Sequence, residues 1–221
     1  MTTPNSVSIA VSASVPDDVI DRLVGSPPGA ASNTIQTVRA NRSQARLHAQ
    51  QSYRALFDPA LLASGEPSLF TLAERFAVAT FVALLHGEGS LIDFYAACLS
   101  QTNAPAGLLQ VMTDEAATGA GPGPYGRFPT GVLSIEDVPG PVYRVSPRHT
   151  PVLGARLSAA FEHAHLLVLH PRDAAARDLQ ALLDADWSTT EIVTLSQMVA
   201  FLAFQVRVVV GLRVLSDRIT S

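Results

Sequence analysis

A short segment between two apolar stretches carries the residues best suited to proton chemistry. It contains His86, Glu88, Asp93 and Tyr95. A carboxylate in an apolar pocket beside a neutral imidazole can transfer a proton on a small organic acid or lactone. We therefore predict Glu88 as the acid or base, Tyr95 as a hydrogen-bond donor and His86 as the imidazole. The alternative is that Glu88 and Asp93 are surface residues and that His86 ends a helix, where the helix dipole favours it.

Arg207 is a second candidate, for substrate binding rather than proton transfer. It lies in the middle of an apolar run, where a guanidinium needs a partner because an unpaired buried charge is prohibitive. Two kinds of partner fit. One is an acidic side chain in the core or across an interface, and the other is a substrate carboxylate, which the guanidinium fork matches in geometry. Both interpretations stay open.

Three histidines are metal ligands by type but not by spacing. At about 100° per residue, His163 and His165 point to nearly opposite sides of one helix. His163 and His170 share a face but are about 10 Å apart, too far for one ion. A metal site would need ligands from elsewhere, such as Glu162, His149 or another chain. We therefore expect no metal and no cofactor.

The composition excludes several classes of enzyme and partner. All fifteen cationic side chains are arginine, so no lysine is present for a Schiff base, a pyridoxal anchor or a phosphate-binding loop. The net charge of −4, without blocks of like charge, attracts neither nucleic acid nor an anionic membrane. Cys98 is the only cysteine, which excludes an intrachain disulfide and a cysteine-rich zinc site.

The sequence favours a cytoplasmic protein. Residues 1–18 lack the cationic start and the uninterrupted apolar stretch of a signal peptide. The longest apolar run, residues 198–215, contains Gln205, Arg207 and Arg213, each costly in the middle of a bilayer. We therefore predict that this run is a buried helix and not a membrane span.

The elements that position these residues are predicted to be helices. No segment outside one long loop has the alternation of apolar and polar residues typical of strands, so the predicted class is all-α. Residues 1–30, rich in Ser, Pro and Gly, are expected to form an N-terminal arm on the surface or on another subunit. Two helical halves are predicted over residues 31–118 and 153–221. A loop rich in glycine and proline, residues 119–152, joins them.

In the first half, a helix over residues 33–57 ends at Asp58-Pro59. Three arginines share one face of it, and on an acidic chain such a face is typical of a solvated or salt-bridged surface rather than a phosphate site. They are Arg39, Arg42 and Arg46.

A helix, a glycine elbow and a second helix are predicted next. Ser68 or Thr71 can cap a helix that runs to Leu85. The sequence His-Gly-Glu-Gly at residues 86–89 then weakens the helix, and it resumes over residues 90–99.

The second half is predicted to hold a helix over residues 153–169, a shorter one over 174–183 and a long final helix. Ser188 and Glu191 fit a capping box at the start of this last helix. Nearly every residue from 192 to 215 is apolar, so we expect it to be buried on most sides, by the domain or by oligomerisation.

The long loop is itself a candidate for function. Residues 119–151 contain six glycines and seven prolines, a density that no regular element survives. Loops of this length inside a compact domain are usually functional or interfacial. We expect it to cover a pocket or to wrap a neighbouring chain, and the alternative is a plain connector between the two halves.

Two segments resemble the carboxymuconolactone decarboxylase and alkylhydroperoxidase D superfamily. Residues 74–87, Glu-Arg-Phe-Ala-Val-Ala-Thr-Phe-Val-Ala-Leu-Leu-His-Gly, are similar to its active-site helix and glycine elbow. Residues 157–215 are similar to the closing helices of its peroxidase-related members, with Trp-Ser-Thr-Thr-Glu-Ile at 187–192 and Phe-Leu-Ala-Phe-Gln-Val-Arg at 201–207. The resemblance implies an all-helical, alkylhydroperoxidase D-like fold that assembles as a trimer or hexamer, with a pocket near subunit contacts.

The resemblance also implies a dithiol chemistry that these residues do not provide. In the peroxidase branch a Cys-x-x-Cys pair follows the elbow, with a histidine one turn later and a glutamate about three turns upstream. Those positions fall here on Glu88 and Leu91, on Tyr95 and on Phe76. Neither glutamate nor leucine can attack a peroxide or resolve a sulfenic acid, so the dithiol mechanism is excluded.

Three functions remain as hypotheses. The first is a non-redox enzyme or binding protein for a small organic molecule, forming homo-oligomers and binding neither nucleic acid nor membrane. The second is a catalytically inactive oligomeric scaffold that pairs with an active relative. The third is residual peroxidase activity, of the antioxidant kind, through Cys98 and an external thiol. With no basic partner nearby in sequence, Cys98 fits a small buried apolar residue better than a nucleophile.

Overall fold

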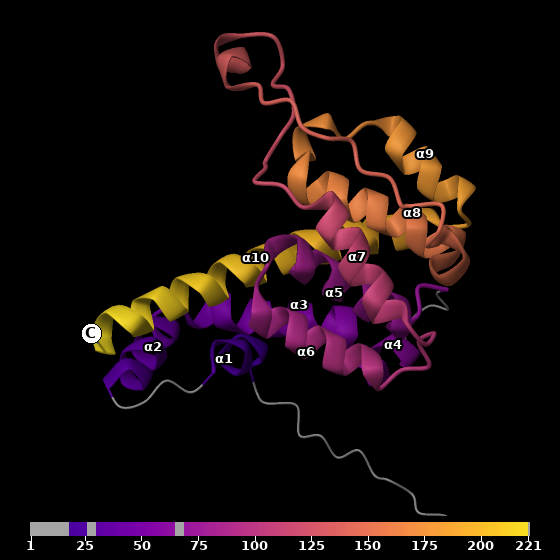
Figure 1. Cartoon of the computed structure of the whole chain (residues 1–221). Coiled ribbons are helices and arrows are strands. Elements are labelled where there is room, and N and C mark those ends of the chain that lie inside the picture. The colour runs from indigo at the N-terminus through magenta and orange to yellow at the C-terminus, as the bar shows by residue number, and fades with distance from the viewer. Residues whose placement is uncertain (1–17, 26–29, 65–68, 221) are drawn as a thin grey trace, which may run out of the picture.

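The computed structural model describes residues 18–25, 30–64 and 69–220, and every regular element in them is a helix (Figure 1). The all-α prediction is therefore confirmed for the described part of the chain, where the only β-type pairing is a single bridge between Gly126 and Val138. The α-helices in chain order are α1 Val19–Val24, α2 Ala30–Ala40, α3 Ser43–Phe57, α4 Pro59–Ser64, α5 Leu72–His86, α6 Gly89–Ser100, α7 Leu108–Gly119, α8 Thr150–Leu169, α9 Ala176–Asp184 and α10 Thr189–Thr220. Two short 3-10 helices are η1 Val132–Glu136 and η2 Pro171–Asp173.

Helix α5 is the central element of the fold. It contacts α3, α6, α7, α8 and α10, and its residues 75–83 are all buried. Several of these are alanine, which lets neighbouring helices approach closely. The start of α5 is a capping box, because Thr71 Oγ1 accepts from the Glu74 N–H and the Glu74 carboxylate accepts from the Thr71 N–H. Thr71 is thus the cap, and Ser68 lies outside the described residues.

The predicted helix, elbow and helix are confirmed. Gly87 ends α5 in the left-handed conformation, with φ 65° and ψ 22°, and its N–H reaches the carbonyl groups of Ala83 and Leu84. Glycine is favoured there because a Cβ atom strains this backbone conformation. The chain turns and α6 packs against α5.

Arg156 on α8 joins the starts of two long helices. Its guanidinium lies 3.1 Å from Glu74 on α5 and 3.8 Å from Glu191 on α10, and it stacks over the Trp187 ring at 4.4 Å. Ser188 and Glu191 form the predicted capping box, with reciprocal hydrogen bonds of 3.3 and 3.0 Å. These contacts hold α8 in place against the body of the molecule.

The start of the described chain belongs to the core, which corrects the prediction of a surface arm. Val19, Ile20 and Leu23 of α1 are buried against other helices. Asp18 caps α1 and pairs with Arg39 at 2.5 Å and Arg46 at 2.7 Å. The rest of the predicted arm, residues 1–17 and 26–29, lies outside the described residues.

The predicted helix over residues 33–57 is two helices. α2 ends at Ala40, and α3 begins at Ser43 after a turn. Arg39 and Arg46 nevertheless converge on Asp18 and Asp21, so part of the arginine face is salt-bridged as expected. The break brings α2 and α3 into contact with each other.

The final helix is buried on one side only within this chain. α10 packs against α1, α2, α3, α5, α8 and α9, but four large apolar residues on it are exposed. They are Val193, Phe204, Val210 and Val214. The expectation of burial on most sides is therefore wrong for the chain by itself.

By length and composition, two helices are apolar enough to cross a membrane. These are residues 150–169 and 189–219, and 44% and 39% of their most apolar windows are buried inside the fold. The core helices of soluble proteins have the same length and composition, so the finding is compatible with a soluble chain.

Candidate functional site

Glu88 lies in an ion pair and not in an apolar pocket. Its Oε1 atom is 2.5 Å from Nη1 of Arg213 on α10 and accepts a hydrogen bond from Ser90 at 3.0 Å. Arg213 also donates to the carbonyl of Leu23 at 2.7 Å. Glu88 thus ties α6 to α10 and α1, which is a structural role.

Tyr95 lies entirely in the core. Its hydroxyl donates to Oε1 of Gln205 at 2.7 Å, and burial raises the pKa of the phenol well above its ordinary value. Its ring packs against Phe57 and Phe94, with centroid distances of 5.4 and 5.0 Å. No ligand can reach this hydroxyl without opening the core.

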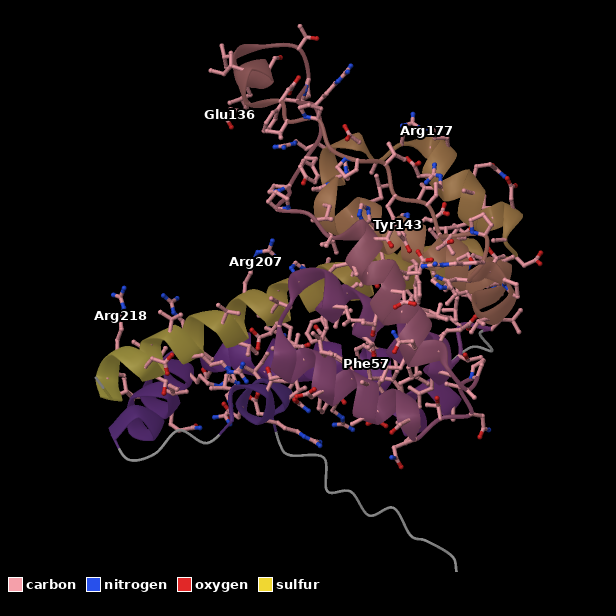
Figure 2. All side chains as sticks on the ribbon, viewed as in Figure 1. Phe57, Glu136, Tyr143, Arg177, Arg207 and Arg218 are labelled. Atoms are coloured by element: carbon pink, nitrogen blue, oxygen red, sulfur yellow. The ribbon has the colours of Figure 1, made fainter. Side chains whose placement is uncertain are left out.

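His86 and Arg207 lie near each other at the surface end of the elbow. Arg207 is exposed, which corrects the expectation of a buried guanidinium, and it donates to the carbonyl of Ala203 at 2.7 Å (Figure 2). Burial, and then the charge of Arg207, lower the pKa of His86, so its imidazole is neutral at pH 7. The proposed catalytic residues at the elbow and Arg207 therefore do not converge on one pocket.

Three of the four positions that the resemblance assigns to reactive groups are filled by core side chains, and Glu88 is the exception. Phe76, Leu91 and Tyr95 are all buried, and Phe76 stacks on Phe57 with a centroid distance of 5.4 Å. Cys98 is half-buried, and burial raises the pKa of its thiol. A raised pKa leaves less thiolate, which disfavours the peroxidase hypothesis.

A deep cleft lies elsewhere, between α8, α9 and the end of the long loop. It has a volume of about 760 Å³, which is in the range of small-molecule sites. The returning part of the loop, residues 142–144, forms one wall, so the loop does line a pocket. The cleft is lined by Arg127, Val142, Tyr143, Arg144, Ala159, Glu162, His163, His165, Leu166, His170, Asp173, Arg177, Asp178 and Ala181.

The three histidines of α8 and its end all line this cleft, but each is held by a different part of the fold. His163 bonds to Ser196 on α10 at 3.0 Å, and His165 bonds to the carbonyl of Gly119 at 2.9 Å. His170 lies between the carbonyl of Pro141 at 3.0 Å and Asp173 at 3.2 Å. In the described part of the chain, no group of three or more His, Cys, Asp or Glu side chains is arranged to hold a metal ion.

Hydrogen bonding assigns the tautomer of His163. Ser196 donates its single hydroxyl hydrogen to the carbonyl of Ile192 at 2.9 Å, so its oxygen accepts a hydrogen bond from the Nε2–H group of His163. Burial lowers the pKa of His163, against a smaller opposing effect of Asp178, so the ring is neutral at pH 7. Its Nδ1 atom carries a lone pair that finds no hydrogen-bond partner among the described residues.

The acidic side chains of the cleft are already occupied by structural donors. Glu162 accepts from the Val145 N–H at 3.0 Å and pairs with Arg144 at 3.3 Å. Asp178 accepts from the Ala175 N–H at 2.9 Å, which caps α9.

Asp173 is occupied in the same way, by the Arg127 N–H at 3.1 Å. Arginine side chains instead stand exposed at the rim, namely those of Arg127, Arg144 and Arg177. Arg177 approaches its neighbour Asp178 only at 3.9 Å. The rim therefore offers guanidinium groups to a ligand, while the carboxylates hold the walls together.

Glu115 on α7 anchors the loop wall. It is buried and accepts from the Tyr143 hydroxyl at 2.7 Å, the Ser146 N–H at 3.0 Å and His149 Nδ1 at 2.6 Å. Burial raises the pKa of Glu115, but these hydrogen bonds lower it by more, so the net pKa lies below the ordinary value. Tyr143 in turn stacks on His165 with a centroid distance of 4.7 Å.

Comparison with known proteins identifies no family. No family model, no curated protein and no solved structure matches this chain.

Sequence reasoning singled out part of this cleft and missed the rest. It named the three histidines and Glu162, but only as metal-ligand candidates. His149, a further candidate, does not line the cleft and bonds instead to Glu115 behind the loop wall. Tyr143, Arg144 and the other rim arginines were missed. For Tyr143, Arg144 and Arg127 the only sequence signal was their place in the long loop, and Arg177 on α9 had no signal.

Proposed function

We propose that this protein binds a small organic anion in the cleft between α8 and α9, and acts on it, if it is an enzyme, without redox chemistry. The observation that carries the proposal is the rim of exposed arginines over a cleft of about 760 Å³, whose wall includes His163, a neutral imidazole with a buried Nδ1 atom that has no partner among the described residues. This keeps the class of function predicted from the sequence but moves the site away from the elbow.

The chemistry of the proposed site follows from these groups. A guanidinium fork binds a carboxylate with two parallel hydrogen bonds, which suits the rim residues Arg177 and Arg127. The Nδ1 atom of His163 is buried in the wall, and it would accept a hydrogen bond from a hydroxyl group of the ligand once the side chains that cover it move. In a reaction, the same atom would remove a proton from the ligand, and Nε2 would stay bonded to Ser196.

We further propose that the chain is a carboxymuconolactone decarboxylase-like protein without the dithiol, cytoplasmic and homo-oligomeric. The order of a capped helix, a glycine elbow, a second helix and a capped closing helix supports this assignment. The absence of thiols at the elbow and the raised pKa of the half-buried Cys98 support a non-redox activity within it.

A titration series tests the site. Wild-type protein would be titrated at pH 7.5 with acetate, succinate and citrate by calorimetry, with inorganic phosphate to separate carboxylate from general anion binding. We expect carboxylate binding that weakens about tenfold or more in Arg177→Gln and in His163→Gln. The matched control is Arg207→Gln, an exposed arginine remote from the cleft, which should bind like wild type.

The outcomes separate the two candidate sites. If Arg207→Gln loses carboxylate binding and Arg177→Gln does not, the binding site lies at the elbow and not in the cleft. Failure of every carboxylate to bind would reject an organic acid as the ligand. Nitrogen-15 NMR of the histidine rings should show His163 as the Nε2–H tautomer, and an Nδ1–H tautomer would remove the proposed acceptor.

The scaffold hypothesis keeps one supporting observation. Glu88, Tyr95 and Arg213 are engaged in contacts that hold helices together, which is what a scaffold derived from an enzyme would retain. Co-purification of a related active chain would favour it, and self-association alone would count against it.

A further inference from the structure

Residues 126–138 form a hairpin that projects beyond α8, away from α1, α2 and α3 (Figure 1). Its two ends pair through the backbone of Gly126 and Val138, and the Phe128 N–H donates to Asp137 at 2.7 Å. Near the tip, the Gly131 N–H donates to Ser134 at 3.0 Å. We call this segment the projecting hairpin. Its own hydrogen bonds hold its shape.

The base of the projecting hairpin is fastened to the body. The guanidinium of Arg172 lies 4.2 Å from the centre of the Phe128 ring. The Arg127 N–H donates to Asp173 at 3.1 Å. A segment attached in this way presents its tip in one direction.

The tip of the projecting hairpin is apolar and exposed. Val132 is 89% exposed and Ile135 is 90% exposed, and Leu133 between them is 48% exposed. Exposed apolar patches of this kind mark interaction sites in soluble proteins. Glu136 and Asp137 follow the tip, so an anionic lipid surface would repel it. A protein surface is therefore the better match.

An apolar groove of about 370 Å³ lies on another part of the molecule, between α3 and α10. It is lined by Ala45, His48, Ala49, Ser52, Phe201 and Phe204. The projecting hairpin of the same chain points away from α3, so it does not reach this groove (Figure 1). We therefore look to a second molecule for the segment that fills it.

Charge complementarity selects the second molecule as a copy of this chain. Glu136 is exposed beside the apolar tip, and Arg207 is exposed one helical turn after Phe204 of the groove (Figure 2). Within the described part of the chain Arg207 pairs with no carboxylate and donates only to Ala203 of its own helix. The tip thus carries an acid, and a base stands exposed one helical turn from the groove.

We propose that the projecting hairpin of one copy inserts Val132 and Ile135 into the α3–α10 groove of a second copy, with Glu136 beside Arg207. The contact joins two different surfaces, so it is heterologous, and repetition of it closes a ring if the rotation between copies allows. This proposed contact between copies does not depend on the function of the cleft.

Sedimentation velocity of the full chain measures self-association and tests this contact. Two variants are compared with wild type, each with one exposed residue of the proposed contact replaced. Ile135→Glu places a charge on the tip, and Phe204→Glu places one in the groove. Each variant should weaken self-association about thirtyfold or more and shift the protein to monomer. Val193→Glu, on the exposed face of α10 but remote from the groove, is the matched control and should associate like wild type. Circular dichroism of each variant should match wild type, since all three side chains are exposed or partly exposed.

Mixing the two variants tests which surfaces meet. Ile135→Glu keeps an intact groove and Phe204→Glu keeps an intact tip, so an equal mixture should form dimers although each variant alone is monomeric. In the same way, Glu136→Arg and Arg207→Glu should each weaken association, and the double variant should restore it. A monomeric wild-type chain, or an oligomer that persists in both Ile135→Glu and Phe204→Glu, would overturn the proposal.

Discussion

Glu115 shows how a single buried carboxylate can position a functional wall. Three donors converge on it, from Tyr143, Ser146 and His149, and all three lie on the returning part of the long loop. Hydrogen bonds to a charged acceptor are stronger than those to a neutral one. The loop therefore stays against α7 and α8 although it has almost no regular structure.

Replacing this carboxylate should loosen the loop. We expect Glu115→Gln to lower the free energy of unfolding by about 2–4 kcal/mol, because an amide cannot accept from all three donors with the strength of a carboxylate. Urea denaturation measures the change. Asp114→Asn is the control, since Asp114 is more exposed and approaches His149 only at 3.8 Å, and it should change stability little.

The same residue predicts a dependence of stability on pH. The folded-state pKa of Glu115 is lowered, so its contribution is complete above its ordinary value of 4.5 and is lost as the pH falls through the lowered folded value. Wild-type stability should therefore fall in acid below pH 4.5 by more than that of Glu115→Gln. If the free energy of unfolding changes with pH in the same way for wild type and Glu115→Gln, the lowered pKa of Glu115 is contradicted.

Tyr95 is predicted to matter for stability and not for ligand binding. Tyr95→Phe leaves the buried Oε1 of Gln205 without its donor, which should cost about 1–3 kcal/mol. Adding Gln205→Leu removes the stranded amide as well, so the double variant should recover part of the loss. Carboxylate binding should be unchanged in both. A loss of binding or activity at wild-type stability would instead support the catalytic role predicted from the sequence.

At the scale of elements, the helix, glycine elbow and helix persist while the residues for redox chemistry are missing. Packing alone accounts for the elements, because α5 is buried along most of its length and Gly87 supplies the left-handed turn. Two of the positions that the resemblance assigns to reactive groups, Phe76 and Tyr95, belong to the aromatic cluster around Phe57. The elbow therefore has a structural role that needs no reactive group.

Two glycines of the elbow offer a matched pair of substitutions. Gly87 has φ 65°, and an added Cβ would meet no atom within 4 Å, so Gly87→Ala should cost about 1–2 kcal/mol through backbone strain alone. Gly89 begins α6, also with open space around a Cβ, so Gly89→Ala should be neutral or stabilising. If Gly87→Ala and Gly89→Ala change the melting temperature equally, the left-handed conformation of Gly87 is not the cause of the lost stability.

The half-buried position of Cys98 on α6 predicts no peroxidase activity. Wild type and Cys98→Ser should consume hydroperoxide at the same background rate in the presence of an external thiol, because burial raises the pKa of this thiol and leaves little thiolate. Peroxide consumption by wild type alone would contradict this expectation and restore the redox hypothesis.

At the scale of the whole molecule, the chain closes on itself because α1 packs against α10 near the two ends of the described chain. Ile20 is fully buried there, so Ile20→Ala should lower the free energy of unfolding by about 2–4 kcal/mol. Val38→Ala, at an exposed position of α2, is the control and should have a small effect. Thermal unfolding measures both. A small effect at Ile20 would favour the surface arm predicted from the sequence.

The long loop links the two proposals in one molecule. Its returning part forms a wall of the cleft, and the projecting hairpin lies within the same loop. Arg127 belongs to both, since its backbone fastens the hairpin to Asp173 and its side chain lines the cleft. The loop lines a pocket, as one of the expectations for it stated, while its contact with a neighbouring chain stays a proposal.

The sequence by itself determined the helical class, the glycine elbow and the capping box at Ser188. Each depends on residues within about one helical turn of each other, so the local order of side chains is enough. Only the tertiary structure decided which polar side chains meet. Glu88 pairs with a residue 125 positions away and Tyr95 with one 110 positions away, and no local pattern encodes such partners. Packing of the helices selected these pairs, and it placed the cleft where distant segments come together.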